Sequence, residues 1–152
     1  AARQASAQYL TLRLGSQEYA IDILRVQELR SYEQPTRMVN SPGFIKGVID
    51  LRGVIVPIID LRLKFGLNQV DYTDFTVVII LNVHGLVVGA VVDAVSDVMD
   101  LAPESIRPAP QFESDIDARF IVGLAHEGER SLIVMNMDAL FSNAELGIAA
   151  AH

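Results

Sequence analysis

The segment GVIDLRGVIVPIIDLR, residues 47–62, contains the tetrapeptide Ile-Asp-Leu-Arg twice and decides the fold of this 152-residue chain. Two apolar runs flank Arg52-Gly53, and glycine readily adopts the positive φ that a tight turn requires. The pattern therefore predicts a β-hairpin with Arg52 at its tip. Pro57 has no N–H group, so the second strand is expected to lie at a sheet edge or to carry a bulge.

The two copies of the tetrapeptide predict different environments for their arginines. Asp60 is a typical N-cap for a short helix over 61–65. On that helix the stem of Arg62 is expected to lie over Phe65 with the guanidinium in water, which gives Arg62 a structural role. Arg52 stands at a hairpin tip, where its side chain has little protein surface to lie on. It is therefore the functional candidate.

The rest of the chain predicts further short strands. Apolar runs and alternations predict strands at 9–14, 18–21, 48–51, 54–59, 76–82, 86–92, 96–101, 120–124 and 131–135, with one helical turn leading into a strand over 22–29 and a C-terminal helix capped by Asn136. So many short strands are typical of an all-β barrel or sandwich. Lobes of about 70 residues would each be marginal alone, which favours two barrels packed together. No repeat of architectural length is visible.

Composition limits the classes of partner. The net charge is −7, with 19 acidic and 12 basic residues, and the longest basic grouping is Arg62-Leu63-Lys64. Nucleic acid is therefore not an expected partner, and a nucleic-acid-binding barrel is disfavoured. The apolar runs are far shorter than the ~20 residues that span a bilayer, so no direct membrane insertion is expected. With no cysteine and no leader before Tyr9, a cytoplasmic protein is predicted.

No catalytic constellation emerges from the sequence, and neither a metal nor a cofactor is expected. Asp93, Asp97 and Asp100 have helical spacing, but the valines around them favour a strand, which scatters the three carboxylates over both faces. A carboxylate-based or metal-dependent hydrolase using these residues is the alternative from another class. A chain rich in apolar residues without an active site is expected to act by binding other proteins.

The segment 46–62 resembles the signature of the CheW family of chemotaxis coupling proteins. That signature is Gly-Val-x-Asn-Leu-Arg-Gly, a few apolar residues, a proline, and then Asp-Leu-Arg. The likeness continues at 18–28, 87–98 and 106–110 and spans 8–146 in effect. One departure is Asp50, where the family usually has asparagine, because it adds a charge able to pair with Arg52 and to lower its availability.

The resemblance implies two intertwined five-stranded SH3-like β-barrels around a shared hydrophobic core, with short helices and a C-terminal helix. It also implies one CheW-like domain over 8–146 between flexible tails at 1–7 and 147–152. No enzymatic activity is implied. CheW-like proteins couple transmembrane chemoreceptors, the methyl-accepting chemotaxis proteins, to the histidine kinase CheA in cytoplasmic arrays at the membrane.

The partners implied are the regulatory domain of CheA and the cytoplasmic tip of the receptor, whose helix lies in an apolar groove between the barrels. A second interpretation keeps the fold and makes the chain a regulatory domain excised from a CheA- or CheV-type protein. The partner-binding residues implied by the resemblance are Arg52, Glu28, Val26, Val98 and Gly89. For Glu28 a bond to a neighbouring arginine stays an alternative, for Val26 and Val98 a place in the core, and for Gly89 close strand packing.

Overall fold

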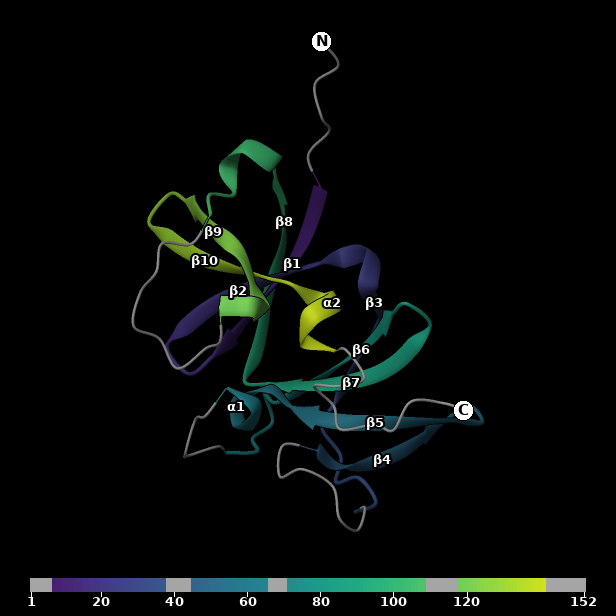
Figure 1. The fold of residues 1–152 in the computed structure, drawn as a ribbon. Helices are drawn as coiled ribbons and strands as arrows, with labels where there is room; N and C mark the ends of the chain where they lie inside the picture. The colour runs from purple at the N-terminus through teal and green to yellow at the C-terminus, as the bar shows by residue number, and fades with distance from the viewer. Residues whose placement is uncertain (1–6, 38–44, 66–70, 109–117, 142–152) are drawn as a thin grey trace.

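The computed structural model describes residues 7–37, 45–65, 71–108 and 118–141. Its strands form two five-stranded sheets (Figure 1), in the order β8-β1-β2-β10-β9, here called barrel A, and β3-β6-β7-β5-β4, here called barrel B. Barrel A contains β1 (Ala7–Leu14), β2 (Gln17–Asp22), β8 (Ala94–Leu101), β9 (Ile121–Glu127) and β10 (Arg130–Met135). Barrel B contains β3 (Val26–Ser31), β4 (Ile45–Leu51), β5 (Val54–Asp60), β6 (Val77–Val83) and β7 (Leu86–Val92). The predicted all-β fold of two SH3-like barrels is confirmed.

Short helices connect and close the barrels. They are the 3-10 helices η1 (Ile23–Arg25), η2 (Pro103–Ser105) and η3 (Ala118–Phe120) and the α-helices α1 (Leu61–Lys64) and α2 (Met137–Leu140). Asp60 caps α1 by accepting a hydrogen bond from the Arg62 amide, and Asn136 caps α2 by accepting one from the Ala139 amide, as predicted. Neither α-helix of the described residues is long and apolar enough to cross a membrane. The expected tails and the far end of the C-terminal helix lie almost wholly outside the described residues.

The barrels are intertwined because the chain crosses between them twice. The first strand after each crossing, β3 in barrel B and β8 in barrel A, is here called an exchanged strand. The chain builds β1 and β2 in barrel A, passes through η1, and adds β3 to barrel B, where β3 pairs with β6. After β7 it returns to barrel A, where β8 pairs with β1. The helical turn predicted before a strand is η1, whose N-cap Asp22 accepts a hydrogen bond from the Leu24 amide at 2.9 Å.

Three apolar clusters explain why the strand sequences are nearly continuous apolar runs. The largest draws side chains from both barrels and both α-helices, and one further cluster fills the interior of each barrel. On β6, Ile79 and Leu81 face the shared core while Val78 and Ile80 face the interior of barrel B. Successive residues of a strand point to opposite faces, so a strand between two cores must be apolar on both.

The two barrels repeat one structural unit, although no repeat of architectural length is visible in the sequence. A hairpin followed by a short helix closes each barrel, β4–β5–α1 in barrel B and β9–β10–α2 in barrel A. Gly47 precedes the cap residue Asp60 by thirteen positions, and Gly123 precedes Asn136 by the same number. In each barrel the second strand of this hairpin also pairs in parallel with a strand of the same barrel. These pairs are β5 with β7 in barrel B and β10 with β2 in barrel A.

The exchanged strands also share a bulge. In β3 the register shifts between Val26 and Glu28, and in β8 an extra residue lies between Val95 and Val98. The sequences there are Val-Gln-Glu-Leu at 26–29 and Val-Ser-Asp-Val at 95–98. A bulge kinks a strand and redirects its side chains, so both exchanged strands are kinked at matching points.

The prediction for Pro57 is wrong in both of its forms. The strand β5 lies between β7 and β4, and the bulge in this hairpin falls on β4, between Ile45 and Gly47. Pro57 faces Val48, whose N–H and C=O bond to Thr36 on its other side at 2.8 and 2.9 Å. Pairing of β5 with β7 begins only at Ile58. The proline is tolerated because no ladder hydrogen bond is required of it at this position.

Candidate functional site

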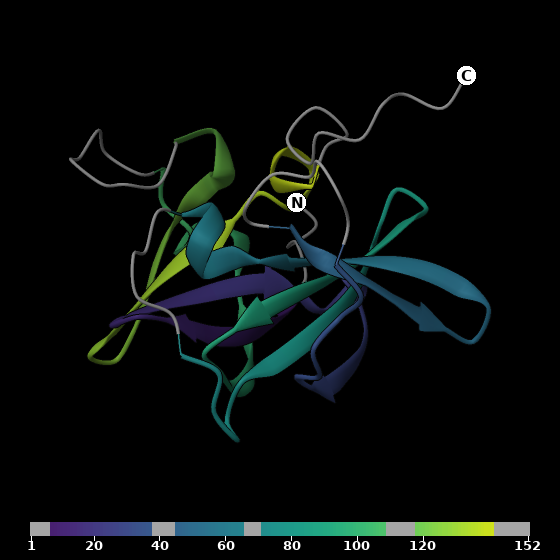
Figure 2. The ribbon, with the colours of Figure 1, turned by 90° about the horizontal axis from the view of Figure 1, so that it is seen from below.

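The β4–β5 hairpin projects from the body of the molecule (Figure 2) and carries Arg52 at its tip. Arg52 and Gly53 both have positive φ, 52° and 88°, which fits a two-residue turn of type I′. The side chain of Asp50 accepts a hydrogen bond from the Gly53 amide at 2.8 Å and so fixes the turn. The Arg52 side chain is 72% exposed, and the hairpin thus holds a guanidinium in water.

Arg52 reaches from the hairpin to the exchanged strand β3. Its Nη2 lies 3.3 Å from Oε1 of Glu28, and Nη1 of Arg30 lies 3.5 Å from the same oxygen. Asp50 was considered as a candidate partner of Arg52, and in the structure its carboxylate accepts a hydrogen bond from the turn backbone. A single, rather long ion pair on the surface contributes little stability, so separating Arg52 from Glu28 costs the fold little.

A pocket of ≈ 270 Å³ opens beside this ion pair, at the seam between the edge strands β3 and β4. Its lining combines Ile58 and Val78, from the cluster inside barrel B, with the charged Arg30, Glu33 and Asp50. The mixture suits a protein side chain with an apolar stem and a polar end.

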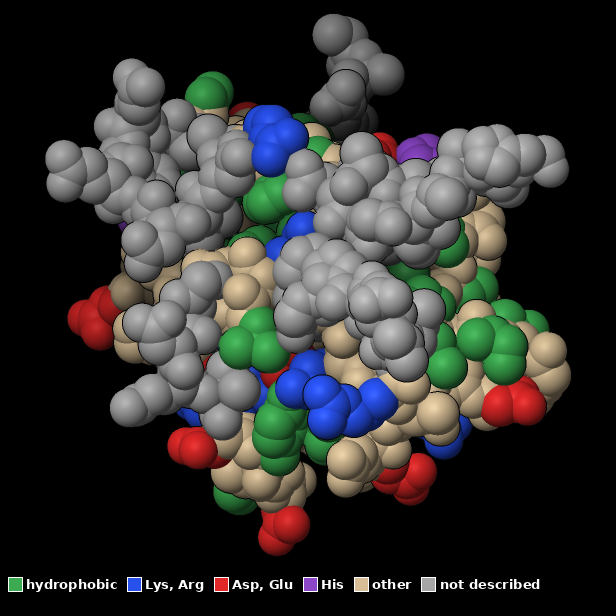
Figure 3. Space-filling model, turned by 60° about the horizontal axis from the view of Figure 1, so that its bottom comes forward, with side chains coloured by type: hydrophobic (Ala, Val, Ile, Leu, Met, Phe, Trp, Pro, Cys, Tyr) green, Lys and Arg blue, Asp and Glu red, His purple; other side chains and the backbone are tan. Residues whose placement is uncertain are grey.

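Apolar side chains are exposed on the same elements. Leu29 on β3 and Val54 and Ile55 after the turn are 47%, 49% and 62% exposed. In Figure 3 hydrophobic side chains reach the surface of the molecule beside acidic ones. Exposed apolar side chains around a charged pair are a combination found at protein interfaces, so the chemistry available here is recognition.

The other residues implied by the resemblance lie apart from Arg52 and Glu28. Val26 is partly buried against the shared core, and Val98 is 49% exposed on β8 of barrel A. Gly89 is buried, and a Cβ there would lie 2.6 Å from the Cδ1 atom of Ile58, so its place in the fold is that of a close packing contact. The structure thus joins Arg52 to Glu28 on barrel B and leaves Val98 exposed on barrel A.

The second arginine of the repeated tetrapeptide is buried, and the expectation that its guanidinium lies in water is wrong. Arg62 is 1% exposed and donates to both carboxylate oxygens of Asp60, at 3.0 and 2.9 Å, and to Asp93 at 2.8 Å. Its guanidinium lies over the ring of Tyr72, with 4.9 Å to the centroid. Burial alone would lower the pKa of Arg62, but the hydrogen bonds and charges of the two carboxylates outweigh it and raise that pKa.

The three aspartates of the hydrolase alternative are engaged separately. Asp93 accepts from Arg62 and from the Gly15 amide, the latter at 2.7 Å, and Asp97 is bound by Arg130. Asp100 is exposed on β8. Within the described parts of the chain, no three His, Cys, Asp or Glu side chains are grouped so that they could hold a metal ion. Their geometry gives no support to the hydrolase.

Sequence reasoning did not single out Arg130, which stands at the start of β10. Its guanidinium binds Glu18 on β2 and Asp97 on β8 at distances of 2.7 to 3.2 Å. The signal that identifies it is the internal repeat, because Asp97 occupies in β8 the position of Glu28 in β3. Each barrel therefore has an arginine from its hairpin bound to an acidic residue at the bulge of its exchanged strand.

Comparison with known proteins gives consistent matches. The CheW-like domain family matches residues 8–145. A protein of Klebsiella aerogenes named "Chemotaxis protein CheW" is 52% identical over 141 residues, which cover 93% of this chain and 85% of that protein. Probable chemotaxis protein CheW of Rhizobium etli is 37% identical over 142 residues, covering 93% and 92%. The crystal structure of scaffolding protein TtCheW from Thermoanaerobacter tengcongensis superposes with a TM-score of 0.84 at 30% identity, covering 93% of this chain and 97% of that one.

Proposed function

Because this chain belongs to the CheW-like domain family, we propose that it is a chemotaxis adaptor that couples chemoreceptors to the histidine kinase CheA. The match over residues 8–145 is the observation that carries the proposal. The role requires no reaction chemistry of the chain itself. The adaptor works in the cytoplasm and is recruited to receptor arrays through its two partners, the regulatory domain of CheA and the cytoplasmic receptor tip.

The contact residues proposed on barrel B are Arg52 and Glu28. The Arg52 side chain is more exposed than that of Glu28. The turn that presents it is fixed by the hydrogen bond between the Asp50 side chain and the backbone of Gly53. Recognition residues are commonly carried on loops held by a rigid scaffold, which describes this tip. A partner carboxylate that replaces Glu28 at Arg52 would gain a charge-assisted hydrogen bond.

The proposed apolar contact residues are Val98 and Val26. Val98 stands on the exchanged strand of barrel A, and Val26 packs at the margin of the shared core. Val98 is exposed, Val26 is partly buried against the core that both barrels share, and the receptor segment proposed to contact them is an amphipathic helix. Gly89 acts inside barrel B, where the missing side chain lets β7 pack closely against Ile58 and Val78.

Co-sedimentation with receptor-bearing membranes, with and without CheA, tests the proposal. The protein is expected to pellet with these membranes and to bring CheA with it. Arg52→Glu is expected to lower the pelleted fraction by tenfold or more without changing the melting temperature. Arg107→Glu, which reverses an exposed charge on barrel A, is the matched control. Absence of pelleting in both conditions would refute the adaptor role, whereas binding that survives Arg52→Glu would refute only this site.

One observation favours a second candidate, a CheW-like domain within a longer adaptor. "Chemotaxis protein CheV3" of Helicobacter pylori is 25% identical over 135 residues, which cover 84% of this chain but only 42% of that protein. The coding sequence on both sides of residues 1 and 152 distinguishes the candidates, since a kinase or receiver segment there would identify the longer protein.

A further inference from the structure

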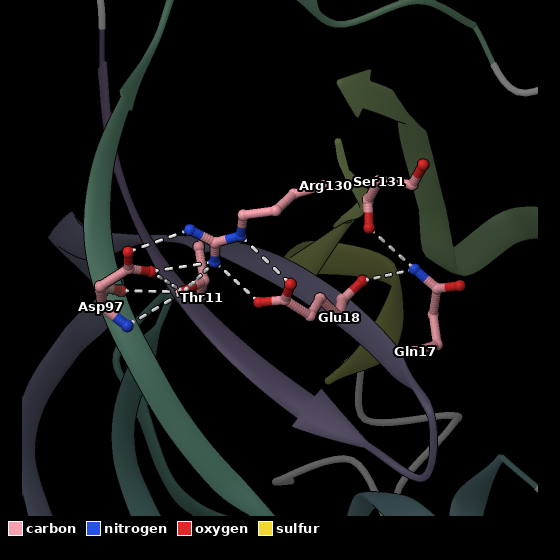
Figure 4. A network of polar contacts seen from close by, with 6 residues as sticks. All are labelled: Thr11, Gln17, Glu18, Asp97, Arg130 and Ser131. Carbon is pink, nitrogen blue, oxygen red and sulfur yellow. Dashed lines mark hydrogen bonds and ion pairs between the residues drawn. The ribbon is translucent and has the colours of Figure 1, made fainter. Parts of the chain in front are cut away.

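Arg130 joins four strands of barrel A (Figure 4). Its Nε and Nη2 donate to the two oxygens of Glu18 on β2 at 3.2 and 2.7 Å. Its Nη1 and Nη2 donate to the two oxygens of Asp97 on β8 at 3.0 and 3.1 Å. Nη2 also lies 3.4 Å from Oγ1 of Thr11 on β1. Two bidentate pairs on one guanidinium fix its geometry, which a lysine cannot reproduce.

The network is built around the bulge of β8. Opposite the bulge stands Thr11, a fully buried residue of β1. Its Oγ1 accepts a hydrogen bond from the Asp97 amide at 3.0 Å and is also hydrogen-bonded to the Asp97 carboxylate. The side chain thus satisfies the backbone group that the irregular ladder leaves without a strand partner. Arg130 also binds the Asp97 carboxylate, and its Nη2 approaches the same Thr11 oxygen.

The consequence of this bulge is the direction of Val98. Val95 pairs with Leu12 and Val98 with Leu10, so three steps along β8 match two along β1. In a regular strand, residues three apart point to opposite faces. The extra residue returns Val98 to the face of Leu10, which is the face of the shared core. Without the bulge, Val98 would turn to the opposite face of the sheet.

The same construction in barrel B shows that the clamp on β8 is the tighter of the two. There the bulge of β3 precedes Leu29, which is 47% exposed, as Val98 is 49% exposed. Glu28 at that bulge is held at a single oxygen, Oε1, by Arg52 at 3.3 Å and by Arg30 at 3.5 Å. Both strands therefore present one apolar residue after an acid that an arginine binds, but only Arg130 binds its acid through both carboxylate oxygens.

We infer that Arg130 is a positioning residue, which fixes the β8 bulge through Asp97 and so presents Val98 to the partner. The inference rests on the proposed function, in which Val98 contacts a receptor helix. Arg130 acts on binding through the strand and does not touch the partner itself. Its effect on affinity must therefore depend on Val98.

A double-mutant cycle tests this dependence. Pelleting with receptor-bearing membranes is measured for the unchanged protein, Val98→Ala, Arg130→Ala and the double variant. Arg130→Ala is expected to weaken binding about tenfold, and to weaken it no further when Val98 is already alanine. Arg130→Lys is expected to behave like Arg130→Ala because a lysine cannot form either of the two bidentate pairs. Arg13→Ala, an exposed arginine of the same sheet, is the control and is expected to bind normally.

Hydrogen exchange provides a readout that does not depend on the partner. Amide exchange in β8 from Asp97 to Met99 is expected to rise in Arg130→Ala while exchange in β6 and β7 is unchanged. Unchanged binding, losses that add in the double variant, or unchanged exchange in β8 would each overturn the inference. If the unchanged protein does not pellet at all, the proposed function fails, and the exchange experiment still decides whether Arg130 fixes the bulge.

Discussion

The tip and the base of the β4–β5 hairpin carry the same tetrapeptide in opposite environments. At the tip, Arg52 is 72% exposed and has one ion-pair contact, to Glu28, at 3.3 Å. At the base, Arg62 is 1% exposed and binds two carboxylates, one of them through both oxygens. An arginine surrounded only by a turn thus stays exposed, whereas one to which distant segments bring carboxylates becomes part of the buried structure.

The base is held by residues from three parts of the fold. Asp60 ends β5 and caps α1, and Asp93 stands where the chain leaves barrel B for β8. Tyr72 donates its hydroxyl to Asp60 at 2.8 Å, and burial together with this bond raises the pKa of Tyr72. Arg62 thus ties the hairpin to the crossover between barrels. A buried charge network of this kind is costly to break because each remaining charge loses its partner.

The largest effect is predicted for Arg62→Ala. Removing the guanidinium leaves Asp60, which is fully buried, without its ionic partner, and the expected loss is about 3–5 kcal/mol in the free energy of unfolding. Equilibrium denaturation measures it. Arg52→Ala is the matched control and is expected to change the same quantity by less than about 0.5 kcal/mol. Equal losses in the two variants would contradict the distinction between base and tip.

The sequence predicted those parts of this comparison that depend on neighbouring residues. The hairpin, its Arg52-Gly53 turn and the cap at Asp60 follow from local spacing and turn chemistry. The burial of Arg62 does not, because Asp93 lies 31 positions away and meets it only through the crossover. For the same reason the ion pair of Arg52 with Glu28 was not predicted, and only a bond from Glu28 to a neighbouring arginine was considered.

The internal repeat was missed for a different physical reason. The two units share strand spacing, caps and bulges, but few identical residues, since a strand buried between two cores requires apolar side chains and not particular ones. The clamp of Arg130 was missed with it. Its acidic partners Glu18 and Asp97 come from distant strands and are recognisable only when β3 and β8 are compared.

The next largest effect compares glycines at the base and the tip of the equivalent hairpin in barrel A. A Cβ at Gly123 would lie 2.3 Å from the backbone oxygen of Arg107, so Gly123→Ala must displace a backbone segment and is expected to cost about 3 kcal/mol. At Gly128, with φ of +62° and open space, alanine meets only backbone strain of about 1 kcal/mol. Thermal unfolding of both variants measures the difference, and the reverse order would contradict it.

A smaller effect concerns acid and the clamp of barrel A. Hydrogen bonds from Arg130 and Thr11 lower the pKa of Asp97 in the folded protein. A lowered pKa stabilises the fold above the ordinary carboxyl value, about 4, and this contribution is lost as the pH falls through the lowered value. The melting-temperature difference between the unchanged protein and Asp97→Asn should therefore be constant from pH 5 to 7 and shrink below about pH 4. A melting-temperature difference that grows below pH 4 would contradict a lowered pKa of Asp97.

The smallest effect concerns the hydrogen bond that fixes the turn at the tip. Asp50 accepts from the Gly53 amide at 2.8 Å, and Asn82 accepts from the Gly85 amide at 2.9 Å in the β6–β7 turn, where His84 and Gly85 again have positive φ. Because asparagine makes the same bond in that turn, Asp50→Asn is expected to change the free energy of unfolding by less than about 0.5 kcal/mol.

The control for this last change is Asp50→Ala, which loses the bond to Gly53 and is expected to cost about 1 kcal/mol by equilibrium denaturation. Receptor binding should follow the same order, since the turn presents Arg52 and Asp50 does not pair with it. If Asp50→Asn strengthened binding as much as Asp50→Ala weakened it, the charge of Asp50 would be acting on Arg52 directly. The tip would then be tuned by electrostatics and not by the geometry of its turn.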